Sequence, residues 1–108
     1  MKYVLITGAS SGIGMAMAVH FASKGHNLIV VARSENKLLN LQSELISDYN
    51  VDVKVKVADL SVPGAAQALY DECRQLDIEV MINNAGFGDF SSIWDIDLDK
   101  ANNMLIST

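Results

Sequence analysis

Three glycines and two serines near the start of the chain are the residues best suited to hold a phosphate group. The stretch TGASSGIG follows a short apolar run and precedes a helix-like pattern. Gly8 can adopt the positive φ of a tight turn, Gly12 leaves room for a pyrophosphate, and Gly14 lets a helix pack closely. The helix N-terminus would supply free N–H groups, and Ser10 and Ser11 can donate hydroxyl hydrogen bonds or cap the helix. The alternative is a plain turn of small residues, because a glycine pattern alone is weak evidence.

The segments around this stretch alternate between strand-like and helix-like patterns. Apolar or alternating runs predict strands at residues 3–7, 28–32, 51–57 and 78–82, and apolar residues at helical spacing predict a helix after each strand. Alternation of this kind builds a parallel sheet with helices on both faces, a Rossmann-type α/β fold. The first expected helix has Ile13, Met17 and Phe21 on its apolar side, and the second is capped by Ser34 and has Leu38, Leu41, Leu45 and Ile46 on its apolar side. Ser61 and Pro63 open the third, whose apolar side is Ala66, Leu69, Tyr70 and Cys73. The last helix is expected from about Leu98.

The texture of the strands predicts their order. Residues 51–57 alternate valine with charged side chains, including Lys54 and Lys56, which is typical of an edge strand. The other three strands are nearly continuous apolar runs, as expected for strands buried on both faces. We therefore predict four strands in the order 3-2-1-4, half of a doubly wound sheet. Residues 78–82 would form the other edge, but they are too apolar for an edge, so we expect part of a sheet to be missing beside them.

Length and composition exclude several classes of partner. The chain has 108 residues, the length of one domain, and a formal net charge of −5. That charge opposes binding to nucleic acid and to an anionic membrane surface. No apolar run approaches the roughly 20 residues that span a bilayer, and the apolar start is too short for a signal peptide, so we expect a cytoplasmic protein. Cys73 is the only cysteine, which excludes an intrachain disulfide and a cysteine metal cluster.

The motifs together resemble the short-chain dehydrogenase/reductase family. TGASSGIG has the spacing G-x-x-x-G-x-G of that family's cofactor motif, and NNAG at residues 83–86 follows the fourth strand as in the family. Asp59 and Leu60 follow the third strand, at the family's acidic position beside adenine. The resemblance covers the whole chain but only the first half of a typical member. It implies a dinucleotide-binding domain over residues 1–108, with cofactor contacts at Gly8, Ser10, Ser11, Gly12, Ile13 and Gly14.

The end of the second strand favours NADP over NAD. An NAD site usually has a carboxylate there, about 20 residues beyond the glycines, to hold the ribose hydroxyls. This chain has Arg33 instead, followed by Ser34. A guanidinium can pair with a 2′-phosphate and stack on adenine, and the serine hydroxyl can donate to the same phosphate. The alternative is an arginine that only faces solvent, and NAD remains the second choice of cofactor.

Five further positions complete the predicted binding site. The resemblance implies that Asp59 accepts a hydrogen bond from the adenine amino group and that the N–H of Leu60 reaches the ring. It also implies that Asn83 and Asn84 connect the fourth strand to nearby loops through side-chain hydrogen bonds. Ala85 and Gly86 would leave room for the ribose and nicotinamide. The alternatives are a loop aspartate and an ordinary Asn-Gly turn. We expect no metal site.

The family's catalytic pair is not found in these 108 residues. Family members use a tyrosine followed four residues later by a lysine, whose charge lowers the pKa of the phenol. Tyr3, Tyr49 and Tyr70 are followed at that spacing by threonine, valine and arginine. We interpret His20 and His26 as structural residues. No residue is therefore assigned a catalytic role, and catalysis is expected to depend on residues beyond position 108.

We interpret the chain as the cofactor-binding part of an oxidoreductase that moves a hydride between NADP and a carbonyl or alcohol. One alternative is a nucleotide-binding fragment without catalysis. The other is a structural fragment that pairs with copies of itself. We also expect a homo-oligomer, because an unpaired strand at residues 78–82 would offer an open edge. The last helix, through Met104, Leu105 and Ile106, would join that contact.

Overall fold

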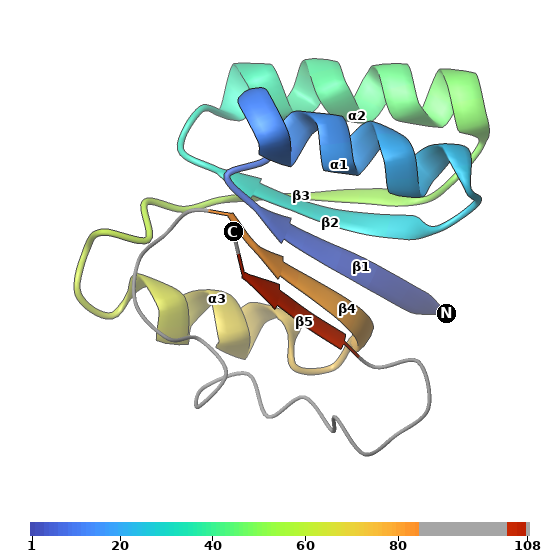
Figure 1. Cartoon of the computed structure of the whole chain (residues 1–108). Coiled ribbons are helices and arrows are strands. Elements are labelled where there is room, and N and C mark those ends of the chain that lie inside the picture. Colours follow the sequence, from blue (N-terminus) through green and yellow to red (C-terminus); the bar gives the residue numbers. More distant parts are fainter. Residues whose placement is uncertain (85–103, 108) are drawn as a thin grey trace.

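The computed structural model describes residues 1–84 and 104–107, the latter by their backbone. A parallel sheet occupies the centre, and helices lie on both of its faces (Figure 1). The strands are β1 (Lys2–Thr7), β2 (Asn27–Ala32), β3 (Val53–Val57), β4 (Asp77–Asn83) and β5 (Met104–Ser107). The helices are α1 (Gly12–Ser23), α2 (Glu35–Tyr49) and α3 (Ala65–Cys73). Helices α1 and α2 cover one face, and α3 covers the other.

The order of the strands is β3-β2-β1-β4-β5, and every neighbouring pair is parallel. The predicted order 3-2-1-4 is thus confirmed for the first four strands, with β3 at one edge. Lys54 and Lys56 of β3 form ion pairs with Asp52 and Glu72 at 3.8 and 3.7 Å. Charged side chains on that strand are the protection that an edge strand needs.

The far side of the sheet differs from the prediction. Met104–Ser107 are not part of a helix: they form β5, which pairs with β4 from Val80 to Asn83. The apolar character of β4 did indicate a fifth neighbour, but that neighbour lies within this chain and is not missing. An unpaired edge at residues 78–82 therefore no longer supports the expected self-association, and neither does a last helix at Met104–Ile106.

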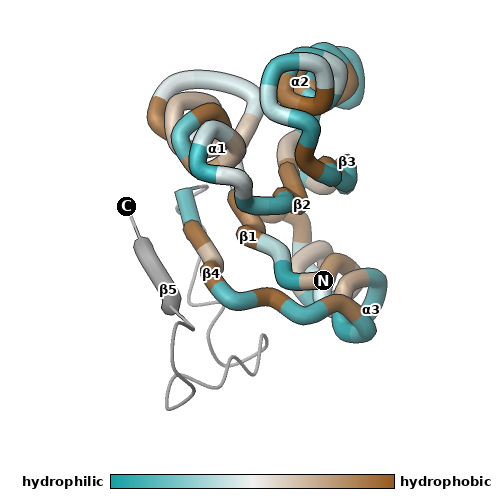
Figure 2. The backbone as a smooth tube through the Cα atoms, turned by 90° about the vertical axis from the view of Figure 1, so that its right-hand side faces the viewer, coloured by the Kyte–Doolittle hydropathy of each residue, from teal (hydrophilic) through white to brown (hydrophobic). Residues whose placement is uncertain are grey.

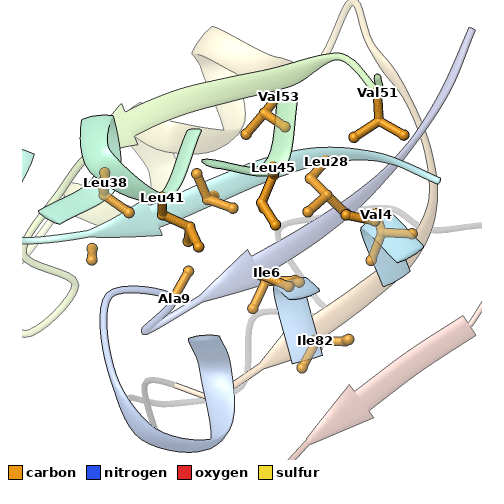
Figure 3. Close-up of a cluster of buried hydrophobic side chains, with 14 of the residues drawn as sticks. Val4, Ile6, Ala9, Leu28, Leu38, Leu41, Leu45, Val51, Val53 and Ile82 are labelled. Atoms are coloured by element: carbon orange, nitrogen blue, oxygen red, sulfur yellow. The ribbon is translucent and has the colours of Figure 1, made fainter. Parts of the chain in front are cut away.

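The core consists of two layers because successive side chains of a strand point to opposite faces. Val4 and Ile6 of β1 pack under α1 and α2 (Figure 3), while Tyr3 and Leu5 pack against α3. Figure 2 shows the hydrophobic stretches of β1, β2 and β4 lying between these helix layers. At the centre, Ile6 aligns with Val30 on one side and with Ile82 on the other.

Helix α1 packs through a different face from the predicted one. Gly14, Ala18 and Ala22 are buried, whereas Ile13 is 63% exposed and Met17 and Phe21 are partly buried. Only small residues allow this helix to approach the sheet so closely, and the larger side chains lie beside the contact.

Helices α2 and α3 follow the sequence patterns more closely. In α2 the predicted residues Leu38, Leu41 and Leu45 are buried, although Ile46 is exposed. Helix α3 starts at Ala65, later than predicted, because Gly64 occupies its N-cap position and Ser61 bonds to Asp59 instead of opening a helix. None of the helices in residues 1–84 is long and apolar enough to cross a bilayer.

Candidate functional site

The glycine turn brings the end of β1 and the start of α1 into close contact. Gly8 and Gly12 adopt left-handed backbone angles, with φ of 63° and 57°, which favour glycine. A Cβ atom on Gly14 would lie 2.1 Å from the carbonyl oxygen of Gly8 and 2.8 Å from the side-chain nitrogen of Asn84. A side chain at this position would displace the turn, so the predicted role of Gly14 in close packing agrees with the geometry.

The N-terminus of α1 is not capped by a side chain. Ser11 holds the N-cap position in an extended conformation, but its hydroxyl makes no capping hydrogen bond, and the first turn contains no acidic residue. The first N–H groups of a helix carry partial positive charge and attract anions. The start of α1 is therefore chemically suited to a phosphate group.

Threonine and asparagine side chains hold this turn against the end of β4. Thr7 is fully buried, and its Oγ1 accepts a hydrogen bond from the N–H of Asn84 at 3.0 Å. The same hydroxyl lies 3.3 Å from Oδ1 of Asn83 and 3.4 Å from the carbonyl oxygen of Ile82, either of which it can donate to. The side chain of Asn84 donates to the carbonyl oxygen of Gly8 at 3.3 Å. The two asparagines thus connect the end of β4 to Thr7 and to the glycine turn.

A cavity of about 680 Å³ lies at the carboxyl ends of β1, β2 and β3, where ligands bind in open parallel sheets. Seven of the residues that line it, which come from three separate loops, were predicted from the sequence. These are Gly8, Ser10, Ser11, Arg33, Ser34, Asp59 and Leu60; the remaining lining residues are Val31, Ala32, Lys37 and Ala58.

The loop after β2 supplies one of the positive charges that line this cavity, at Arg33. Arg33 is exposed, and Ser34 caps α2 by accepting a hydrogen bond from the N–H of Lys37 at 3.4 Å. Because that bond uses only an acceptor lone pair of the hydroxyl, its proton is still available to a ligand. The predicted double use of Ser34, as a cap and as a donor, is compatible with this geometry.

The loop after β3 supplies the negative charge. Oδ1 of Asp59 accepts hydrogen bonds from the hydroxyl and the N–H of Ser61, at 2.6 and 3.1 Å. The pKa of the Asp59 carboxyl lies below its usual value. The main cause is the hydrogen bond from the Ser61 hydroxyl, followed by the bond from the Ser61 N–H, and the positive charge of Arg33 acts in the same direction. The group is therefore ionised at neutral pH, and its other oxygen can accept a hydrogen bond from an amino group.

Tyr3 and His26 do not line this cavity. The hydroxyl of Tyr3 donates to Asp52 at 2.5 Å near the amino-terminal end of β1, and this bond is the main cause that raises the pKa of Tyr3 to about 12. His26 pairs with Glu79 at 3.1 Å. No group of three or more potential metal ligands occurs in residues 1–84.

Not every predicted site residue lines the cavity. Gly12, Ile13, Gly14 and Asn83 form or brace the turn beside it, and Ala85 and Gly86 lie outside the described residues. Sequence reasoning missed Thr7 and Lys37. The signal for Thr7 was a polar residue at the end of a buried strand, and the signal for Lys37 was a cation in the first turn of a helix.

The chain is similar to enzymes of known activity. It is 42% identical over 86 residues to a very-long-chain 3-oxoacyl-CoA reductase of Eremothecium gossypii. The aligned region covers 78% of this chain and 24% of that protein. It is 35% identical over 104 residues to a 7beta-hydroxysteroid dehydrogenase of Mediterraneibacter gnavus. This second aligned region covers 96% of this chain and 40% of the relative. The matched part of the chain therefore spans about a quarter of the length of the first relative and two fifths of the length of the second.

Solved structures and a family profile agree with these similarities. A short-chain dehydrogenase from Sphingobium yanoikuyae in complex with NADPH superposes with a TM-score of 0.74 at 42% identity, over 80% of this chain and 34% of that one. The profile of the short chain dehydrogenase family matches residues 2–107. Together with the glycine turn and the strand order, this match shows that the chain belongs to the short chain dehydrogenase family.

Proposed function

We propose that residues 1–108 form the NADP-binding domain of an oxidoreductase that transfers a hydride between NADP(H) and a carbonyl or alcohol substrate. The observation that carries this proposal is the cavity between the uncapped start of α1 and the loop with Arg33 and Ser34. A pyrophosphate fits the first of these, and a 2′-phosphate fits the second. Bound NADPH would supply the hydride.

Several contacts would orient the cofactor. Asp59 would accept a hydrogen bond from the adenine amino group through the carboxylate oxygen that Ser61 does not use. Thr7 and Asn84 would hold the glycine turn in place at the start of α1. Solved relatives in complex with NADPH, among them the Sphingobium dehydrogenase and an L-sorbose reductase from Gluconobacter frateurii, have a similar fold over about four fifths of this chain. Substrate binding and proton transfer are assigned to no described residue.

The choice between NADP and NAD can be tested at Arg33. In the purified protein we expect Arg33→Asp to reduce the ratio of NADPH to NADH affinity by about a hundredfold, because a charged hydrogen bond is replaced by repulsion. Titration calorimetry with both cofactors measures this ratio. Arg74→Asp, at the exposed end of α3, is the matched control and should leave the ratio unchanged.

An unchanged ratio in Arg33→Asp would refute the assignment of this residue. Absence of binding for both cofactors in the unmodified protein would instead favour the alternative of a structural, self-associating fragment. The predicted cytoplasmic location and homo-oligomer stay predictions.

A further inference from the structure

Lys37 lines the cavity beside Arg33 and Ser34, although the sequence pattern did not single it out. It is the third residue of α2 and is exposed. Its backbone N–H is bonded to Ser34, the residue that caps this helix. Lys37 is therefore anchored, through its backbone, to the loop that the proposed function assigns to the 2′-phosphate.

The position is an unfavourable one for a lysine if only the helix is considered. A positive charge in the first turn opposes the helix dipole, and the third helical position after a serine cap favours Glu or Gln, which can bond back to the cap. Lysine has no acceptor for such a bond. Departures from local helix preferences of this kind are expected where a residue serves a site.

No described carboxylate compensates this charge. In residues 1–84 no ion pair involves Lys37, and the residues three and four positions away on its helix are Asn40 and Leu41. Glu35 lies in the same first turn, but it is not among the residues that line the cavity. The ammonium group is thus available to a ligand in the cavity.

The net charge of the residues that line the cavity also favours a role of Lys37 in binding an anionic ligand. Arg33 and Asp59 interact electrostatically and carry opposite charges, so together they contribute no net charge. Lys37 is the third charged residue of the lining and makes it positive. A phosphate monoester carries about −1.5 to −2 charges at neutral pH, so the single positive charge of Arg33 does not balance it.

We propose that Lys37 is a second cation for the 2′-phosphate and a determinant of cofactor specificity that acts together with Arg33. This inference rests on the proposed function, because it presupposes a phosphate on the adenosine ribose. Arg33 would supply the planar pair of donors, and Lys37 a mobile point charge.

Two small ligands that differ only in the 2′-phosphate test this proposal: adenosine 2′,5′-bisphosphate and adenosine 5′-monophosphate. By calorimetry on the purified protein, we expect Lys37→Ala to weaken the bisphosphate about tenfold and the monophosphate less than about twofold. Lys37→Arg should retain bisphosphate affinity, whereas Lys37→Gln should lose it as Lys37→Ala does. The salt dependence of bisphosphate binding should also become shallower in Lys37→Ala.

Two controls separate this role from a structural one. Lys24→Ala, at the exposed C-terminal end of α1, should change neither affinity. The unfolding free energy of Lys37→Ala should stay the same or rise slightly, because a charge that opposes the helix dipole is removed. Equal losses for both ligands, or no loss for the bisphosphate, would overturn the proposal.

Arg33→Ala, measured in the same way, distinguishes this failure from a failure of the proposed function. If Arg33→Ala abolishes the preference for the bisphosphate and Lys37→Ala does not affect it, the NADP assignment holds and the role of Lys37 is wrong. If the unmodified protein binds both ligands equally, the NADP assignment fails, and the inference about Lys37 fails with it.

Discussion

Helices α1 and α2 lie side by side on the same face of the sheet, yet their N-termini are built in opposite ways. Ser34 caps α2 with its side chain, and Glu35 favours the dipole of its first turn, whereas Ser11 forms no such cap on α1 and no acid follows it. Each helix begins at the cavity. The difference shows that α2 is stabilised by its own residues, while the start of α1 is left available to an anionic ligand.

The two helices also contact the sheet differently. Helix α2 buries three leucines, at positions 38, 41 and 45, and α1 buries Gly14, Ala18 and Ala22. Small residues bring the backbone of α1 close to the glycine turn, where a pyrophosphate would have to approach. In α1 the packing and the binding geometry therefore depend on the same positions, and in α2 they depend on different ones.

The largest effect is expected for Gly14→Ala. The added Cβ would overlap the carbonyl oxygen of Gly8, so the turn and the start of α1 must move apart. We expect a loss of about 3 kcal/mol in the free energy of unfolding, measured by urea denaturation. Gly25→Ala, which meets no atom within 4 Å, is the control and should lose less through backbone strain alone. Equal losses in the two variants would contradict the close contact that distinguishes α1.

A more local change, Gly12→Val, separates ligand binding from stability. Gly12 and Gly25 both have positive φ and open space around them, so valine should strain both positions to a similar extent. Only Gly12 lies at the start of α1, and only there would the side chain obstruct a pyrophosphate. We expect Gly12→Val to weaken NADPH about a hundredfold relative to Gly25→Val in calorimetry, which corresponds to about 2.8 kcal/mol. Equal affinities would exclude phosphate binding at this turn.

The smallest effects are expected when the hydroxyl of Ser34 or Ser11 is removed. Ser34→Ala removes the cap of α2 and should cost about 1 kcal/mol in the free energy of unfolding. Ser11→Ala removes no capping bond, so it should leave the stability nearly unchanged and instead weaken NADPH a few-fold if the hydroxyl reaches the phosphate. Denaturation and calorimetry on both variants check this. A comparable loss of stability in Ser11→Ala would show that the two N-termini are alike after all.

Much of this architecture could be predicted because its signals are local. Apolar runs, the cap at Ser34 and the glycine spacing each depend on residues that are close in the sequence. The charged pattern of β3 correctly indicated an edge strand, and the apolar pattern of β4 correctly indicated that it has neighbours on both sides. The cavity lies at the carboxyl ends of β1, β2 and β3, because parallel strands bring these ends together.

Other features depended on contacts between distant residues. Ile13 has the spacing of a core residue but is exposed, because the close approach of α1 to the turn selects Gly14 and Ala18 for the interface. Met104–Ser107 has apolar residues that suit a helix or a strand, and the open edge of β4 decides in favour of a strand. Thr7 became part of the site only because β1 and β4 are neighbours in the sheet.

The sequence by itself therefore determined the alternation of elements, the glycine turn, the cap of α2 and the sign of the charges after β2 and β3. Tertiary structure alone decided which face of α1 is buried, which strand lies beside β4, and that Lys37 joins Arg33 and Asp59 at one cavity. The physical reason is the distance along the sequence over which each interaction acts. Backbone propensities and capping act over a few residues, whereas burial, strand pairing and the balance of charges in a cavity depend on segments that meet only in the folded chain.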